Sequence, residues 1–179
     1  MDILERQLLL EQLASSEARL LELVDGLTRE QWNFQETPER WSIAENIEHL
    51  IVFESFIRGA IQRALETPAE MEKKTVVGAK ESLVLGLAHS RSTKLKAREA
   101  ALPMGTWPDS TELIAELRRT RAQTCVFVSK TDAELRDHFF PHIVFGDLDC
   151  YQWLVALGQH GFRHALQIEE IKEHPGYPN

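Results

Sequence analysis

The spacing of apolar residues restricts the fold of this chain more than any other feature of its sequence. Apolar residues recur every three or four positions over several long segments. In the last segment, about 149–173, they are Trp153, Leu157, Ala165, Ile168 and Ile171. This period is that of an α-helix with one buried face, whereas a half-buried strand would alternate apolar and polar residues. We therefore predict long helices over about 2–25, 42–67 and 149–173, and another that opens at Asp109 or Ser110.

Helix-capping patterns mark where several helices begin. In a capping box, a short polar residue caps the first turn, and a Glu or Gln three positions later closes it. The pairs of this kind that precede predicted helices are Thr28 and Gln31, Ser42 and Glu45, Thr131 and Glu134, and Asp149 and Gln152. The second and fourth pairs start long helices. The first and third predict short ones, and the helix after Thr131 is expected to end at about His138.

The fold class that these patterns predict is all-α: a four-helix bundle with additional short helices. The chain has 179 residues with only 9 glycines and 7 prolines, which favours long helices over a turn-rich sandwich. Its length fits a single domain over residues 1–179. The weakest pattern covers residues 69–108, where 80–101 is compatible with a helix. Loops are predicted at 103–108 and around Pro141 and Gly146.

The charge of the chain argues against nucleic-acid binding. The net charge is −8 and the pI is near 5.4, whereas phosphate binding needs clustered Lys and Arg. The densest basic group, Arg118, Arg119 and Arg121, follows Glu112 and Glu116. We interpret it as a solvated helix face.

Neither a signal peptide nor a membrane span is expected. The chain starts with the acidic stretch Met-Asp-Ile-Leu-Glu-Arg, and no apolar run approaches the about 20 residues of a span. We therefore expect a cytoplasmic protein. The two cysteines, Cys125 and Cys150, are far apart in the sequence, and we interpret them as buried core thiols rather than as a disulfide or a reactive thiol.

His160 and His164 stand four residues apart on the apolar stripe of the last predicted helix. This spacing puts both rings on one face, with Cβ atoms about 6 Å apart, so that they can share one ion. A zinc metalloprotease would carry Glu after the first histidine, but this chain has Gly161. Taken alone, the pair is explained better by two hydrogen-bonded histidines in the core or at the surface than by a metal site.

His49 adds a third candidate ligand from the inward face of the second long helix, because bundle cores build metal sites from facing helices. Neutral imidazoles of His49, His160 and His164 would leave coordination positions open, as in a catalytic site. Gln167, one turn after His164, could orient a histidine or a bound water. Glu45 could accept the other N–H of the His49 ring, although its capping-box position explains it equally well.

The remaining histidines occupy less specific positions. His138 and His142 are expected in a loop, near the mouth of a site at most. His89 and His174 stand among polar residues and are expected to be exposed. Arg163 lies off the apolar stripe and is expected at the surface.

Two stretches resemble the DinB/YfiT-like superfamily. Residues 41–50, Trp-Ser-Ile-Ala-Glu-Asn-Ile-Glu-His-Leu, are similar to its second-helix motif W-[ST]-x-x-E-x-x-x-H-L. Residues 158–168, Gly-Gln-His-Gly-Phe-Arg-His-Ala-Leu-Gln-Ile, are similar to its last-helix motif H-x-x-H/R-H-x-x-Q-[IL]. The turn at 145–148, Phe-Gly-Asp-Leu, is also typical of the family. The resemblance extends over nearly the whole chain in helix order.

The resemblance implies a four-helix bundle with one crossover, often a homodimer, that holds a divalent metal on His49, His160 and His164. Members of the family include thiol S-transferases that use low-molecular-weight thiols and a mycothiol-dependent maleylpyruvate isomerase. Others have been described as metal-dependent hydrolases. Many members carry Glu directly after the first histidine of the last motif, so Gly161 removes an acid/base role from that position.

The expected cofactor is a divalent cation: zinc or nickel first, with iron or manganese as alternatives. Three functions stay open: thiol transfer to a small-molecule electrophile, metal-activated hydrolysis, and a non-enzymatic, stress-related metal-binding module. The first needs a low-molecular-weight thiol, because the sequence offers no obvious protein nucleophile or second base beside the histidines.

Overall fold

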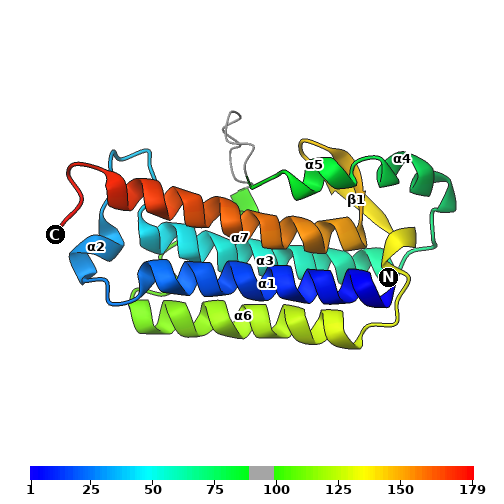
Figure 1. The fold of residues 1–179 in the computed structure, drawn as a ribbon, viewed down its shortest axis with the longest axis horizontal. Helices are drawn as coiled ribbons and strands as arrows, with labels where there is room; N and C mark the ends of the chain where they lie inside the picture. The colour runs from blue at the N-terminus through cyan, green and yellow to red at the C-terminus, as the bar shows by residue number, and fades with distance from the viewer. Residues whose placement is uncertain (89–98) are drawn as a thin grey trace.

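The computed structural model describes residues 1–88 and 99–179. In this part of the chain, four helices of more than 20 residues lie side by side (Figure 1). They are α1 (Ile3–Val24), α3 (Ile43–Leu65), α6 (Ser110–Lys130) and α7 (Cys150–Glu173). Shorter helices join or cover them, so the predicted all-α bundle with additional short helices is confirmed. None of the described helices is long and apolar enough to cross a lipid bilayer.

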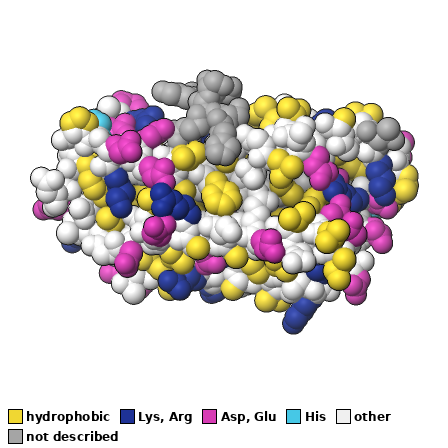
Figure 2. Space-filling model, in the orientation of Figure 1, with side chains coloured by type: hydrophobic (Ala, Val, Ile, Leu, Met, Phe, Trp, Pro, Cys, Tyr) yellow, Lys and Arg dark blue, Asp and Glu magenta, His cyan; other side chains and the backbone are white. Residues whose placement is uncertain are grey.

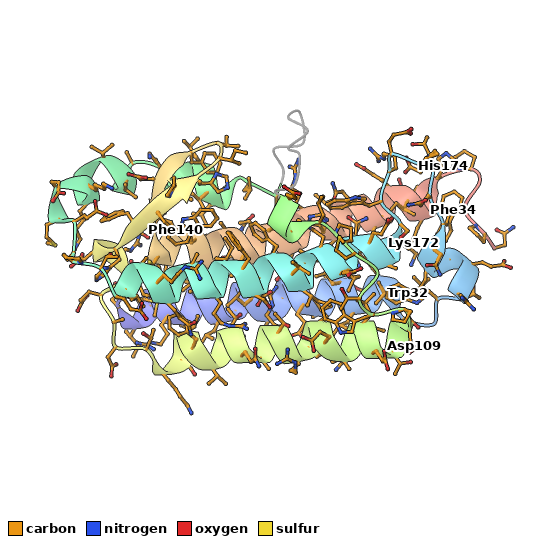
Figure 3. All side chains as sticks on the ribbon, turned by 180° about the vertical axis from the view of Figure 1, so that it is seen from behind. Trp32, Phe34, Asp109, Phe140, Lys172 and His174 are labelled. Atoms are coloured by element: carbon orange, nitrogen blue, oxygen red, sulfur yellow. The ribbon has the colours of Figure 1, made fainter. Side chains whose placement is uncertain are left out.

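Capping boxes start three helices at the predicted positions. At α3, the Ser42 hydroxyl accepts the backbone N–H of Glu45, and the Glu45 carboxylate accepts that of Ser42 at 2.7 Å. The same reciprocal bonds join Asp149 and Gln152 at the start of α7. They also join Thr28 to the third residue of α2 (Arg29–Asn33). Asp109 caps the first turn of α6 and is labelled in Figure 3.

The capping box predicted at Thr131 is wrong. Thr131 ends α6 instead: its backbone N–H donates to the carbonyl of Phe127 at 2.9 Å. Its hydroxyl accepts the N–H of Ala133, and the expected helix is a single 3₁₀ turn, η3 (Leu135–Asp137). The backbone N–H of Thr131 thus bonds within the preceding helix. It cannot also donate to the Glu134 side chain, as a capping box requires.

The loop predicted around Pro141 and Gly146 is a β-hairpin. Strand β1 (Phe139–His142) pairs antiparallel with β2 (Gly146–Asp149). The hairpin lies on α7, where the Phe140 ring stacks on Trp153 with centroids 4.5 Å apart. Phe140 lies on β1 and is labelled in Figure 3. Two strands of four residues are too short for an alternating pattern, and packing on α7 stabilises them.

The described part of the weakly patterned region, 69–88 and 99–108, contains four short helical elements. They are η1 (Met71–Lys73), α4 (Lys74–Gly78), α5 (Glu81–Leu85) and η2 (Glu99–Ala101). Within the stretch 80–101, which the sequence marks as compatible with a helix, the described residues form α5 and η2. Residues 89–98, and with them His89, lie outside the described residues.

Two clusters of buried apolar side chains fill the bundle along its length. On α7, the first cluster ends at Leu157 and the second begins at Ala165. His160 and His164, two of the predicted metal ligands, lie between these two positions on α7. Outside the core, acidic, basic and apolar side chains are interspersed on the face that Figure 2 shows.

One basic residue that we predicted to be solvated is buried. Arg118 and Arg119 are exposed, but Arg121 is 1% exposed and pairs with Glu54 of α3 at 3.0 Å. Arg121 follows Leu117 by four residues, so it lies on the buried stripe of α6. Its counter-charge comes from another helix, which the local charge pattern does not reveal.

Candidate metal centre

Three histidines converge between α3 and α7, the neighbouring helices in Figure 1. His49 lies in the first half of α3, and the i, i+4 spacing of α7 stacks His160 and His164 on one face. One ring nitrogen of each lies within 4.8 Å of the other two. His49 and His164 are buried, and His160 is partly buried. The structure thus brings the predicted ligand residues together.

The His49 ring is held by the main chain of η2. Its Nδ1 lies 2.6 Å from the carbonyl oxygen of Ala101. A carbonyl only accepts, so Nδ1 carries the hydrogen and Nε2 keeps a free lone pair. Burial lowers the pKa of His49, although the bond to Ala101 opposes this effect. The ring is therefore neutral near pH 7, as a metal ligand must be.

His160 faces His49 directly, with the two Nε2 atoms 2.9 Å apart. Because His49 Nε2 carries only a lone pair, this distance requires either a hydrogen on His160 Nε2 or a cation that both atoms share. Two imidazoles on one tetrahedral zinc ion have nitrogens about 3.3 Å apart, since each Zn–N bond is about 2.0–2.1 Å. Burial, and then the neighbouring His49, lower the pKa of His160 well below its ordinary value.

His164 is contacted by a residue that the sequence analysis missed. Its Nδ1 lies 2.7 Å from the side-chain oxygen of Asn46, which is buried on α3. Asn46 precedes His49 by three residues, so both share one helix face. A polar residue on that inward face was the signal that could have identified it.

Glu48, another residue missed by the sequence analysis, anchors the segment that follows η2. Its buried carboxylate accepts the backbone N–H groups of Met104, Gly105 and Thr106 at 3.1, 2.9 and 2.9 Å. Burial alone would raise the pKa of Glu48, but these bonds outweigh it and lower the pKa. Glu48 therefore fixes the main chain three residues after Ala101, whose carbonyl holds the His49 ring.

Two aromatic rings contact the histidines, one from the residue before the α3 cap and one from α3 itself. The Trp41 ring centroid lies 4.8 Å from that of His49 and 6.3 Å from that of His164. Phe53 lies on the other side, 4.4 Å from His160 and 5.8 Å from His49. These rings lower the local polarity and restrict the rotation of the imidazoles.

The two residues predicted to support the ligands differ in their positions. Of the alternatives for Glu45, the structure shows the capping role: its carboxylate accepts from Ser42 and Gln35, while His49 bonds to Ala101. Gln167 is partly buried, and its side-chain oxygen has no hydrogen-bond partner within residues 1–88 and 99–179. Its role beside the histidines stays a prediction.

The other histidines that the structure describes, His138, His142 and His174, lie outside the cluster. His138 Nδ1 lies 3.1 Å from the carbonyl of Ala64, and the His142 ring packs against Phe145 and Trp153 in the hairpin. His138 lies in the loop between η3 and β1, as predicted, whereas His142 is the last residue of β1 rather than a loop residue. His174, at the end of α7, is exposed as predicted, and Figure 3 shows it close to Phe34.

Two residues next to the ligands on α7 face other parts of the protein. Arg163, predicted at the surface, is only 8% exposed, because the segment after α5 covers it: Nη1 lies 3.5 Å from the carbonyl of Leu87. Gly161 packs against α1, where an added Cβ would lie 3.1 Å from the Ser16 side chain. Position 161 thus belongs to the contact between α1 and α7.

The cysteines have the protonation state of inert thiols. Cys150 is buried as predicted, and burial raises the pKa of its thiol to about 12. Cys125 is only partly buried, contrary to the prediction, yet burial still raises its pKa. Both remain thiols near neutral pH, and a thiolate is the form that reacts.

Comparison with known proteins identifies relatives of the chain. The DinB superfamily pattern matches residues 12–168. The chain is 30% identical to a Bacillus subtilis (strain 168) protein named "Uncharacterized protein YuaE", over 148 residues that make up 83% of this chain and 87% of YuaE. No solved structure gives a significant match. From the family pattern and this relative, together with the helix order and the motifs on α3 and α7, the chain belongs to the DinB superfamily.

Proposed function

We propose that His49, His160 and His164 bind one divalent metal ion, and that the loaded protein transfers a low-molecular-weight thiol to a small electrophile. The observation that carries metal binding is the 2.9 Å approach of the His49 and His160 Nε2 atoms, with a free lone pair on His49. Zinc and nickel are the first candidates, and iron and manganese are the alternatives, because imidazole suits several of these ions.

The donor set fits such an ion. Burial lowers the pKa values of His49 and His160, so both rings are neutral near pH 7. Neither ring has to lose a proton before it binds a metal ion. Three ligands leave at least one coordination position for a small molecule. A divalent ion at this place would lower the pKa of a bound thiol and so supply a thiolate near neutral pH.

The residues of the chain have supporting roles in this proposal. His49 and His164 are each held through Nδ1, and Trp41 and Phe53 flank the rings. The raised pKa of Cys150 argues against a protein thiolate as the nucleophile, which leaves that part to a thiol from solution. We place this chemistry in the cytoplasm, where thiols are kept reduced.

Two alternatives use the same three histidines. Metal-activated hydrolysis needs no added thiol. A non-enzymatic, stress-related binding module would use the ion to stabilise the fold. The hydrogen bond between His49 and Ala101 favours this alternative, because it connects the histidines to the segment that Glu48 anchors.

The test measures metal content and turnover on the same samples. Protein purified without a His-tag or added metal is analysed for bound ions, then stripped and reloaded with each candidate ion. Loss of a chromogenic electrophile is followed with and without a low-molecular-weight thiol, for wild type, His164→Ala and the control His174→Ala. His174 lies at the end of the same helix and is exposed.

We expect turnover that needs both metal and thiol, is lost in His164→Ala and is retained in His174→Ala. Equal rates in all three proteins would contradict the proposal. Turnover of an ester without added thiol would indicate the hydrolase. Metal binding that raises the melting temperature without turnover of any substrate would indicate the non-enzymatic module.

A further inference from the structure

Asn46 lies between a candidate ligand and the first turn of its own helix. Its side-chain oxygen is 2.7 Å from His164 Nδ1. Its side-chain nitrogen is 2.8 Å from the carbonyl oxygen of Ser42 and 3.5 Å from that of Trp41. The side chain is 2% exposed, so its bonds are made within the protein.

These neighbours allow only one orientation of the amide. The carbonyl oxygens of Ser42 and Trp41 can only accept hydrogen bonds, so the NH₂ group must face them. The reverse orientation would place two oxygens 2.8 Å apart without a hydrogen between them. The Asn46 oxygen therefore faces His164 and accepts a hydrogen from Nδ1, so that Nε2 carries the lone pair whenever the ring is neutral.

We propose that Asn46 is a positioning residue that keeps His164 in the tautomer with the hydrogen on Nδ1 and so presents Nε2 to the metal. The consequence for the ion rests on the proposed metal binding, but the tautomer itself does not. The fixed ring also needs less ordering when an ion binds. Residues that hold metal-ligating histidines in this way typically contribute 10–100-fold to metal affinity.

His49 is held in the same tautomer by a different kind of group. Its Nδ1 donates to the main-chain carbonyl of Ala101, whereas His164 depends on a side chain. A substitution can therefore release His164 and leave the support of His49 in place. This difference makes the role of Asn46 measurable.

Three variants separate the positioning role from a purely structural one. Asn46→Leu removes both the acceptor for His164 and the bond to Ser42. Asn46→Asp keeps an acceptor for His164 but loses the donor. Asn33→Leu is the matched control: Asn33 donates its amide to the carbonyl of Arg29, also four residues earlier, at 2.7 Å, but is exposed on α2.

The first measurement is the tautomer of His164 in the metal-free protein, read from long-range ¹H–¹⁵N NMR correlations at a pH where the ring is neutral. We expect hydrogen on Nδ1 in wild type, Asn46→Asp and Asn33→Leu, and a shift toward the other tautomer in Asn46→Leu. Circular dichroism and the melting temperature of each variant show that it is folded.

The second measurement is zinc affinity by competition with a chelator. We expect Asn46→Leu to bind about 10–100-fold more weakly than wild type, Asn46→Asp to recover most of this loss, and Asn33→Leu to bind normally. The proposal is overturned by hydrogen on Nε2 in wild type, by an unchanged tautomer in Asn46→Leu, or by equal affinity losses in Asn46→Leu and Asn46→Asp. Wild type that shows the expected tautomer but binds none of the candidate ions would contradict the proposed function and still support this role of Asn46.

Discussion

The Nε2 atoms of His49 and His160 lie 2.9 Å apart where α3 and α7 meet. Since His49 donates through Nδ1 to Ala101, the pair has one hydrogen at most between its two facing nitrogens. A metal ion would replace that hydrogen and bind both lone pairs.

Replacing His160 with Ala should remove both metal binding and the stabilisation that metal brings. An ion at 100 times its dissociation constant stabilises the folded state by about 2.7 kcal/mol. We expect this gain in wild type and His174→Ala, and none in His160→Ala. Thermal unfolding with and without zinc measures it, and an equal gain in His160→Ala would place the ion elsewhere.

Acidification should destabilise the metal-free protein. The unfolded chain binds protons on its histidines near pH 6.5, whereas His49 and His160 have lowered pKa values in the folded state. The unfolded state therefore holds more protons as the pH falls through about 6.5, and the free energy of unfolding decreases by up to about 1.4 kcal/mol per pH unit for each histidine.

Urea unfolding of metal-free protein between pH 7.5 and 5.5 measures this decline. A His160→Phe variant should lose part of it, whereas His174→Ala should keep it, because His174 is exposed. A free energy of unfolding that does not change over this range would contradict the lowered pKa values.

Glu48→Gln should loosen the segment after η2. A glutamine offers one oxygen, and its NH₂ group cannot accept hydrogen bonds from the remaining backbone N–H groups. We therefore expect the free energy of unfolding to decrease by about 1–3 kcal/mol. Amide hydrogen exchange should accelerate at 104–106. Glu45→Gln is the control on the same helix, because a capping box accepts either Glu or Gln. Similar effects of the two substitutions would argue against Glu48 as the anchor.

Arg121→Met should be strongly destabilising. Removal of the cation leaves the Glu54 carboxylate buried without its partner, which typically costs about 3–5 kcal/mol. Arg119→Met removes an exposed partner of Glu116 and should cost less than about 1 kcal/mol. Chemical denaturation measures the free energy of unfolding of both variants. Equal decreases would mean that the buried pair contributes no more to stability than the exposed pair.

The homodimer implied by the family resemblance also stays a prediction. Light scattering of the full chain, with and without bound metal, would measure its mass in solution against the 20.5 kDa of one chain. A monomer at all concentrations would contradict it.

The long helices could be predicted because their signals are local. Ser42 with Glu45, and Asp149 with Gln152, bond within one turn, so their spacing already specifies the start of α3 and α7. The convergence of the histidines was also predicted: helical spacing made His160 and His164 a plausible pair, and the inward-facing His49, together with the family resemblance, completed the set of three ligands. The burial of Arg121 was not, because it depends on Glu54, 67 positions earlier on another helix.

The same limit applies to the groups that support the ligands. Asn46 was visible as a polar residue on an inward face, but its partner could be identified only once α3 and α7 were placed side by side. The hairpin at 139–149 depends on Trp153, whose indole N–H donates to the Phe140 carbonyl at 3.0 Å. Contacts of this kind join elements, and the sequence around each residue does not encode them.

The acceptor for His49 is a main-chain carbonyl, so it does not depend on the side chain at position 101. Because Ala101 is 1% exposed, its identity can drift during evolution only among small residues without disturbing the ring. The number of residues between Ala101 and the amides that Glu48 binds cannot drift in the same way, because an insertion or deletion there would displace the carbonyl. Selection at this edge of the centre should act on segment length, which a position-by-position measure of conservation does not record.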